Sequence, residues 1–83
     1  MTLNEVPVGK SVQVEKINCQ GALKRRIMDM GITKGVKIYV RKIAPFGDPM
    51  ELTVRGYELS IRKADAANIL VADVAGAAPE GRP

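Results

Sequence analysis

The sequence contains no histidine and a single cysteine, Cys19. Without histidine or a pair of cysteines, the usual ligand sets of zinc sites cannot be assembled. The same absence excludes Cys-His and Ser-His catalytic pairs. No pattern marks a pair of working carboxylates either. We therefore expect no catalytic residue, no metal ligand and no cofactor, and we predict that the protein is not an enzyme.

The lone cysteine also bears on the cellular compartment. Cys19 cannot form an internal disulfide, which favours a reducing environment. We expect Cys19 to be a small buried residue near a strand end rather than a reactive thiol. The sequence has no apolar run close to the ~20 residues of a membrane span, and residues 1–10 do not resemble a signal peptide. These observations predict a cytoplasmic protein without membrane insertion.

Aromatic residues are scarce, and tryptophan is absent. The 83 residues carry 13 Lys and Arg against 9 Asp and Glu, a net charge of +4, with both signs interspersed. A basic balance permits nucleic acid, an anionic membrane or an acidic protein as the partner, and selects none of them. So short a chain forms one domain with a small core.

The clearest pattern is a β-hairpin. Apolar and polar residues alternate over residues 50–54 and again over residues 57–61, the period of a half-buried strand. Between the two runs, Gly56 can adopt the positive φ of a tight turn. Pairing Val54 with Tyr57 places every apolar residue of the hairpin on one face. It also brings Glu51 within diagonal reach of Arg62.

The segment before the hairpin, residues 44–49, reads Ala-Pro-Phe-Gly-Asp-Pro. Its prolines and glycine predict a defined loop. Phe46 is the chain's only phenylalanine. We favour the interpretation that Phe46 folds back as a lid on an open end of a barrel, and the alternative is an exposed aromatic for a partner.

The remaining segments complete a mainly β architecture. Strands are predicted at residues 11–17, 36–41 and 69–74, and a break in the alternation at Lys16 suggests either a bulge or the end of the first strand. A helix is predicted over residues 21–30, ended by Gly31, and a helical turn within residues 63–68. About five strands with one short helix after the first indicate a small, bent, partly open barrel over residues 1–74. Residues 75–83 are expected to be a disordered tail.

The predicted helix has an apolar stripe and an outer face. The stripe would point inward and consists of Leu23, Ile27 and Met30. At 100° per residue, Lys24, Arg25 and Met28 lie on the far side. A methionine flanked by cations is typical of an adaptable contact surface. The alternative is that Met28 only covers a neighbouring loop. We take Lys24, Arg25 and Met28 as candidate partner-binding residues, with Phe46 second.

Four motifs together resemble a known family. They are L-x-x-V-x-x-G-K at residues 3–10, G-x-L-K-R-R-x-x-D-M-G at residues 21–31, A-P-F-G-D-P at residues 44–49, and R-G-Y-E-L-S-I-R-K at residues 55–63. The sequence resembles the FeoA family, ferrous iron transport protein A of bacteria. This resemblance implies an SH3-like β-barrel with an inserted helix. It also implies a cytosolic accessory of FeoB, the membrane ferrous iron transporter with a GTP-binding domain.

The ligand chemistry adds to this expectation. Carboxylates and carbonyls are poor selectors of iron, so protein contact is a better prediction than metal carriage. One alternative is the similar module of DtxR-type iron-dependent repressors, which we disfavour because no helix-turn-helix precedes it. Another is an RNA-binding small barrel, which the mixed charges and few aromatics disfavour. We expect no nucleic acid partner.

Overall fold

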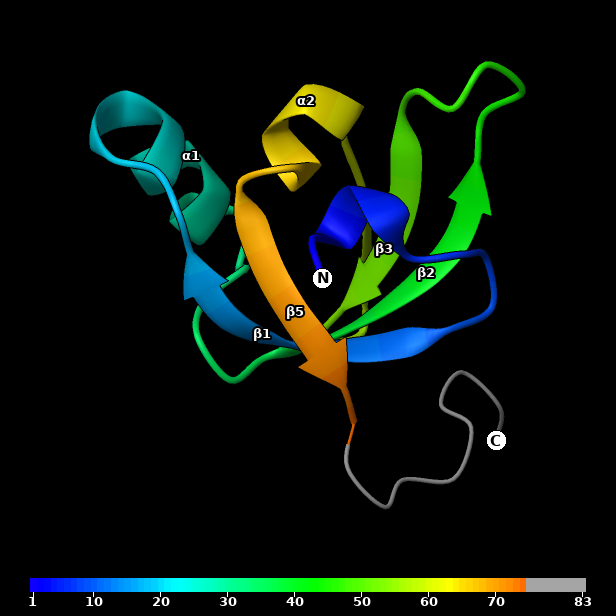
Figure 1. The fold of residues 1–83 in the computed structure, drawn as a ribbon, viewed down its shortest axis with the longest axis horizontal. Coiled ribbons are helices and arrows are strands. Elements are labelled where there is room, and N and C mark those ends of the chain that lie inside the picture. Colours follow the sequence, from blue (N-terminus) through cyan, green and yellow to red (C-terminus); the bar gives the residue numbers. More distant parts are fainter. Residues whose placement is uncertain (75–83) are drawn as a thin grey trace.

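The structure, a computed structural model, describes residues 1–74. Its elements in chain order are the 3₁₀ helix η1 (Leu3–Glu5), β1 (Ser11–Ile17), α1 (Gly21–Asp29), β2 (Lys37–Ile43), β3 (Met50–Val54), β4 (Tyr57–Ile61), α2 (Lys63–Ala66) and β5 (Ile69–Asp73) (Figure 1). The tail predicted at residues 75–83 lies outside the described residues.

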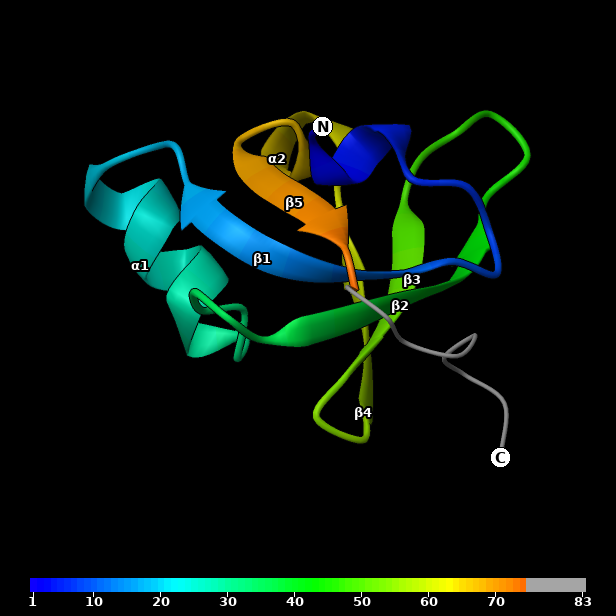
Figure 2. The ribbon, with the colours of Figure 1, turned by 60° about the horizontal axis from the view of Figure 1, so that its bottom comes forward.

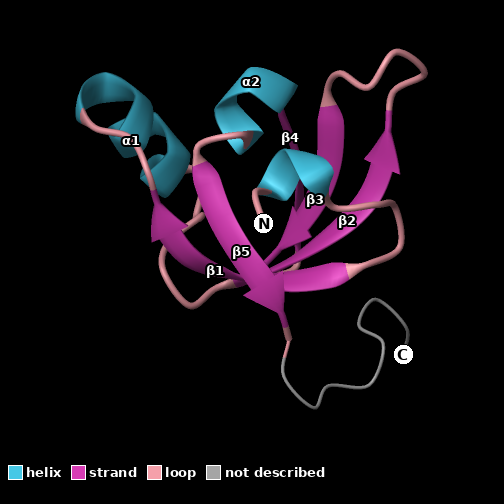
Figure 3. Cartoon of the chain, viewed as in Figure 1, coloured by secondary structure: helices cyan, strands magenta, loops and turns pink. Residues whose placement is uncertain are grey.

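The five strands form one antiparallel sheet in the order β4-β3-β2-β1-β5. The sheet is strongly bent, and α2 connects its two edge strands, β4 and β5 (Figures 1 and 3). Helix α1 follows β1 directly and stands beside the sheet (Figure 2). The prediction of a mainly β fold with a helix after the first strand is confirmed.

The core is apolar throughout. Seventeen hydrophobic residues are buried, and no polar or charged residue of residues 1–74 is buried with them. The buried set is Leu3, Val6, Val12, Val14, Ile17, Ile27, Ile32, Val36, Ile38, Val40, Met50, Leu52, Val54, Ile61, Ala66, Ile69 and Val71. Branched aliphatic residues dominate, which suits the pleated surface of a small bent sheet.

Two bulges bend the sheet. The first lies between Val14 and Lys16 opposite β5, so Glu15 is the extra residue. Because of it, Val14 and Ile17 both point into the core although they are three positions apart. This agrees with the bulge that was one of the two alternatives predicted at Lys16. The second bulge, between Val40 and Lys42 opposite β3, was not predicted.

The hairpin of β3 and β4 has the predicted register, with Val54 opposite Tyr57, Leu52 opposite Leu59 and Met50 opposite Ile61. The turn residues Arg55 and Gly56 both have positive φ, 52° and 81°, as a type I′ turn requires. Sequence reasoning assigned a positive φ only to Gly56.

Two details of the hairpin were not predicted. Tyr57 is 76% exposed, because it stands next to the turn on the edge strand β4, where no further strand covers it. Glu51 keeps the predicted register, opposite Ser60 and diagonal to Arg62, but its ion-pair partner is Arg41. The second bulge makes Arg41 the extra residue of β2, opposite the start of β3, where its side chain meets that carboxylate.

Helix α1 begins at Gly21, as predicted, and is ended as predicted by Gly31, whose φ is 94°. The Gly31 N–H donates to the Met28 carbonyl at 2.9 Å, and the Ile32 N–H donates to the Ile27 carbonyl at 3.4 Å. This is the Schellman arrangement, which brings the residues at its two ends together. Ile27 and Ile32 are accordingly both fully buried.

The N-terminal segment is a part of the fold that sequence reasoning missed. Leu3 and Val6 are buried, η1 packs on α2 and β5, and Thr2 forms an isolated bridge with Leu70. The Thr2 N–H donates to Glu5 Oε1 at 2.8 Å. This bond from the Thr2 backbone lowers the pKa of the Glu5 carboxyl. The segment is thus a fixed cover of the core.

We predict that Ile27→Ala lowers the free energy of unfolding by about 2–5 kcal/mol, because it opens a cavity where α1 meets the core. Met28→Ala, one residue along, should change it by about 0.5 kcal/mol or less, because this side chain is largely exposed. Urea denaturation followed by circular dichroism measures both values. Equal losses in the two variants would contradict the assignment of Ile27 to the core and of Met28 to the outer surface.

Candidate partner-binding surfaces

The outer face of α1 presents the three residues that the sequence singled out. Ile27 fixes the rotation of the helix by pointing into the core, so Lys24, Arg25 and Met28 are exposed. Together with Gly21 and Asp29 they line a surface hollow of about 450 Å³. Met28 remains 43% exposed, so a large part of its side chain is open to solvent. We call Lys24, Arg25 and Met28 the α1 face.

The structure extends the α1 face toward the sheet. A second hollow, of about 380 Å³, lies between α1, β1 and the turn before β2, and is lined by Glu15, Lys16, Ile17, Lys24, Met28 and Lys34. Lys24 and Met28 border both hollows. Lys16 and Lys34 are therefore two further cations beside Met28. Lys34 lies in the turn between α1 and β2, and its position beside Met28 emerges only from the tertiary fold.

The two arginines of α1 differ in whether they form an ion pair within the described chain. Arg26 pairs with Asp65 of α2 at 3.2 Å. Within the described chain, Arg25 makes no ion pair with Asp29, although the i, i+4 spacing would allow one. Exposed ion pairs contribute little to stability. The difference between Arg25 and Arg26 therefore matters for binding a partner rather than for folding. The positive charge of Arg25 is available to a partner.

Phe46 lies in the loop between β2 and β3 and is 98% exposed. The prediction that it forms a lid is therefore wrong. The physical reason is that Leu3 and Val6 of the N-terminal segment, with Ala66 of α2, already cover the core. The loop extends away from the sheet on the side opposite α1 (Figures 1 and 2). The α1 face and Phe46 thus belong to two separate surfaces.

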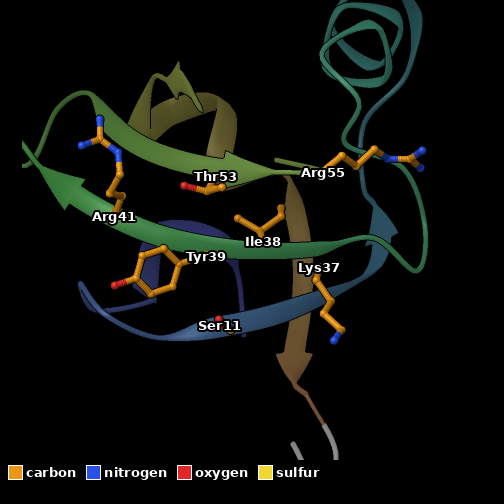
Figure 4. Close-up of a pocket in the computed structure, with 7 residues that line it drawn as sticks. All are labelled: Ser11, Lys37, Ile38, Tyr39, Arg41, Thr53 and Arg55. Atoms are coloured by element: carbon orange, nitrogen blue, oxygen red, sulfur yellow. The ribbon is translucent and has the colours of Figure 1, made fainter. Parts of the chain in front are cut away.

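A third surface was not predicted at all. On the outside of the sheet, a hollow of about 400 Å³ is lined by Ser11, Lys37, Ile38, Tyr39, Arg41, Thr53 and Arg55 (Figure 4). Ser11, Tyr39 and Thr53 form a row across three adjacent strands. The Ser11 hydroxyl is buried and has no hydrogen-bond partner within residues 1–74. Ser11, Tyr39 and Thr53 stand next to buried residues in their strands, so the sequence showed only the signal of an ordinary solvent face.

The cations at this hollow are held by neighbours. Arg41 pairs with Glu51 and also lies 3.7 Å from Glu58. Arg55 donates to the Thr33 hydroxyl at 3.1 Å. Elsewhere Lys10 pairs with Asp73 at 2.8 Å. These contacts break the basic charge into separate patches, which disfavours a continuous track for a nucleic acid backbone.

Residues that could hold a metal are not gathered in the described part of the chain. No group of three or more His, Cys, Asp or Glu side chains occurs there. Cys19 is half-buried against the core after β1, close to the environment expected for it. Among residues 1–74, no helix is long and apolar enough to span a membrane.

Comparison with known proteins gives one consistent result. The model of the FeoA domain family matches residues 1–73. A fusion protein of Fe(2+) transport protein A with the Fe(2+) transporter FeoB, from Porphyromonas gingivalis, is 34% identical over 71 residues. That match covers 86% of this chain and 8% of the fusion protein.

Solved structures agree in fold. An FeoA-like protein from Clostridium acetobutylicum is 41% identical, with a TM-score of 0.84, covering 99% of this chain and 95% of that one. FeoA of Stenotrophomonas maltophilia, described as a prokaryotic SH3 domain protein complexed with zinc, is 28% identical with a TM-score of 0.76. This second match covers 87% of this chain and 89% of the other. The expected SH3-like fold is confirmed.

We predict that Fe²⁺ titrated anaerobically into the purified protein shows no saturable binding at micromolar concentrations. The reason is that residues 1–74 gather no cluster of three or more ligands, and scattered carboxylates hold divalent iron weakly. Isothermal titration calorimetry measures this directly. Stoichiometric binding of one ion per chain would contradict the prediction.

Proposed function

This chain belongs to the FeoA family, and we therefore propose that it is a cytoplasmic accessory protein of ferrous iron uptake that binds a FeoB-type transporter directly. The observation that carries the proposal is the fusion protein of P. gingivalis, in which a relative of this chain and the transporter are one polypeptide. A covalent link raises the effective concentration of two domains for one another. Separate chains need a binding surface to achieve the same association.

The proposed role is recognition rather than chemistry. The chain has no histidine and one cysteine, and its described part holds no cluster of metal ligands. We infer that iron and GTP are handled by the transporter, and that this protein acts by protein contact. Neither catalysis nor iron carriage is assigned to it.

The α1 face is the proposed primary contact. Met28 offers a flexible apolar side chain, and Lys24 and Arg25 place positive charge beside it. Such a surface complements an acidic surface with a small apolar patch. The charges speed encounter and select the partner, and burial of the methionine slows dissociation. Phe46 is proposed as a second contact.

The proposal predicts that Arg25→Glu combined with Met28→Glu weakens binding to the full-length transporter in detergent by at least about tenfold, about 1.4 kcal/mol. Both side chains are exposed, so the fold should be retained. Isothermal titration calorimetry measures the dissociation constant of each variant.

A matched control is Arg55→Glu combined with Tyr57→Glu at the β3–β4 turn. It makes the same change in net charge and also removes one exposed large apolar side chain. It should bind like the unmodified protein. Equal weakening by both double variants would indicate a general charge effect and remove the α1 face from the proposal. If the unmodified protein does not bind, direct contact itself is wrong.

A further inference from the structure

The most anomalous side chain of the described residues is Phe46. It is the only phenylalanine of the chain, and 98% of its surface is exposed. Phenylalanine is among the residue types most often buried. The nearest comparable aromatic is Tyr57 at 76%, which carries a hydroxyl that water can solvate. A fully exposed phenyl ring has no such compensation.

The loop that carries Phe46 is held in one conformation. The Ala44 N–H donates to the Pro49 carbonyl at 3.1 Å, and the Gly47 N–H donates to the Ala44 carbonyl at 2.7 Å. Asp48 Oδ1 accepts the Lys63 N–H at 2.9 Å, which ties the loop to the start of α2. These bonds fix the backbone on both sides of the ring. The backbone position from which the ring projects is therefore set, and the ring lies in solvent instead of packing on the sheet.

We propose that Phe46 is a plug that enters a preformed apolar pocket with an acidic rim on a partner protein. That the partner is the FeoB-type transporter rests on the proposed function. A rigid loop loses little conformational freedom on binding, which is the condition under which one buried aromatic contributes most to affinity. An exposed aromatic side chain on a hydrogen-bonded loop is what we expect of an interface hot-spot residue in the unbound protein.

The acidic rim follows from the charges around the loop. The Lys63 ammonium lies 3.6 Å from where a Cβ on Gly47 would stand, immediately beside Phe46. Lys42, at the base of the loop on β2, is also exposed. Asp48, the carboxylate within the loop, accepts the Lys63 backbone N–H, and Glu51, opposite Lys42, pairs with Arg41. Carboxylates around the pocket would therefore meet positive charge.

A pocket in a protein fits these observations better than a lipid surface does. Stable attachment to a bilayer takes two strong signals, and here one ring stands beside two lysines. A fluid bilayer also gains little from a ring carried on a fixed loop, whereas binding in a shaped pocket benefits from it. The plug and the α1 face lie on opposite sides of the molecule (Figures 1 and 2), so each is tested independently of the other.

The test compares Phe46→Ala, Phe46→Leu and the control Tyr57→Ala for binding to the full-length transporter in lipid nanodiscs. Phe46→Ala should weaken binding by at least about tenfold. Phe46→Leu should stay within about threefold, because it keeps most of the apolar volume. Tyr57→Ala removes a similar exposed ring elsewhere and should bind as the unmodified protein does. Both sites, Phe46 and Tyr57, are exposed, so unchanged thermal unfolding will confirm intact folds.

A second measurement keeps the phenyl ring and adds only a fluorine atom to it. Because Phe46 is the only phenylalanine, incorporation of 4-fluorophenylalanine labels this position alone. The difference in its ¹⁹F chemical shift between H₂O and D₂O reports contact with solvent. It should be large in the free protein and should fall sharply once the transporter is bound.

The outcomes separate the two proposals. Binding by the unmodified protein, with Phe46→Ala equally tight and the ¹⁹F label still solvated, overturns the plug and leaves the proposed function standing. No binding by the unmodified protein overturns the proposed function and, with it, the plug. Phe46-dependent binding to transporter-free vesicles of phosphatidylglycerol would show that lipid is the occupant and would also overturn the plug.

Discussion

The burial of an entirely apolar core is the constraint on which this small protein depends. Side chains from all five strands, from η1 and from both α-helices meet inside the bent sheet, and within residues 1–74 none of the buried residues is polar or charged. With no ionic or hydrogen-bonded network inside, the fold rests on close packing of branched aliphatic residues. Every polar or charged residue among residues 1–74 is thereby left at least partly exposed, although the Ser11 hydroxyl itself is buried. Large apolar side chains that stay outside the core, such as Met28 and Phe46, then call for an explanation.

The parts of the fold that were predictable are those with a local cause. The alternation around Arg55 and Gly56 determined the hairpin register, and Gly31 marked the end of α1, because turns and caps depend on backbone conformations that few residues accept. The bulge at Glu15 was visible as a break in alternation. The bulge at Arg41 was not, because residues 37–40 alternate normally up to it.

The errors came from long-range packing. Phe46 was assigned to the open end of the barrel, because nothing in the sequence shows that Leu3 and Val6 cover the core there. The alternation placed Tyr57 on the apolar face of the hairpin but did not predict its exposure, because alternation takes no account of the edge of a sheet. The α1 face was predicted by helical periodicity, yet its neighbours Lys16 and Lys34 come from other elements. Local pattern thus found the centre of that surface and missed its surroundings.

The attachment of α1 has a consequence for its dynamics. One fully buried residue, Ile27, joins the helix to the core, with Leu23 and Met30 only half-buried. Elements with so few buried apolar contacts open locally at a lower free energy than the strands that surround the core. The amide protons of α1 should then exchange with solvent sooner than those of β1 and β2. A partner that closes over the outer face would suppress this opening, so docking and the order of the helix are linked equilibria.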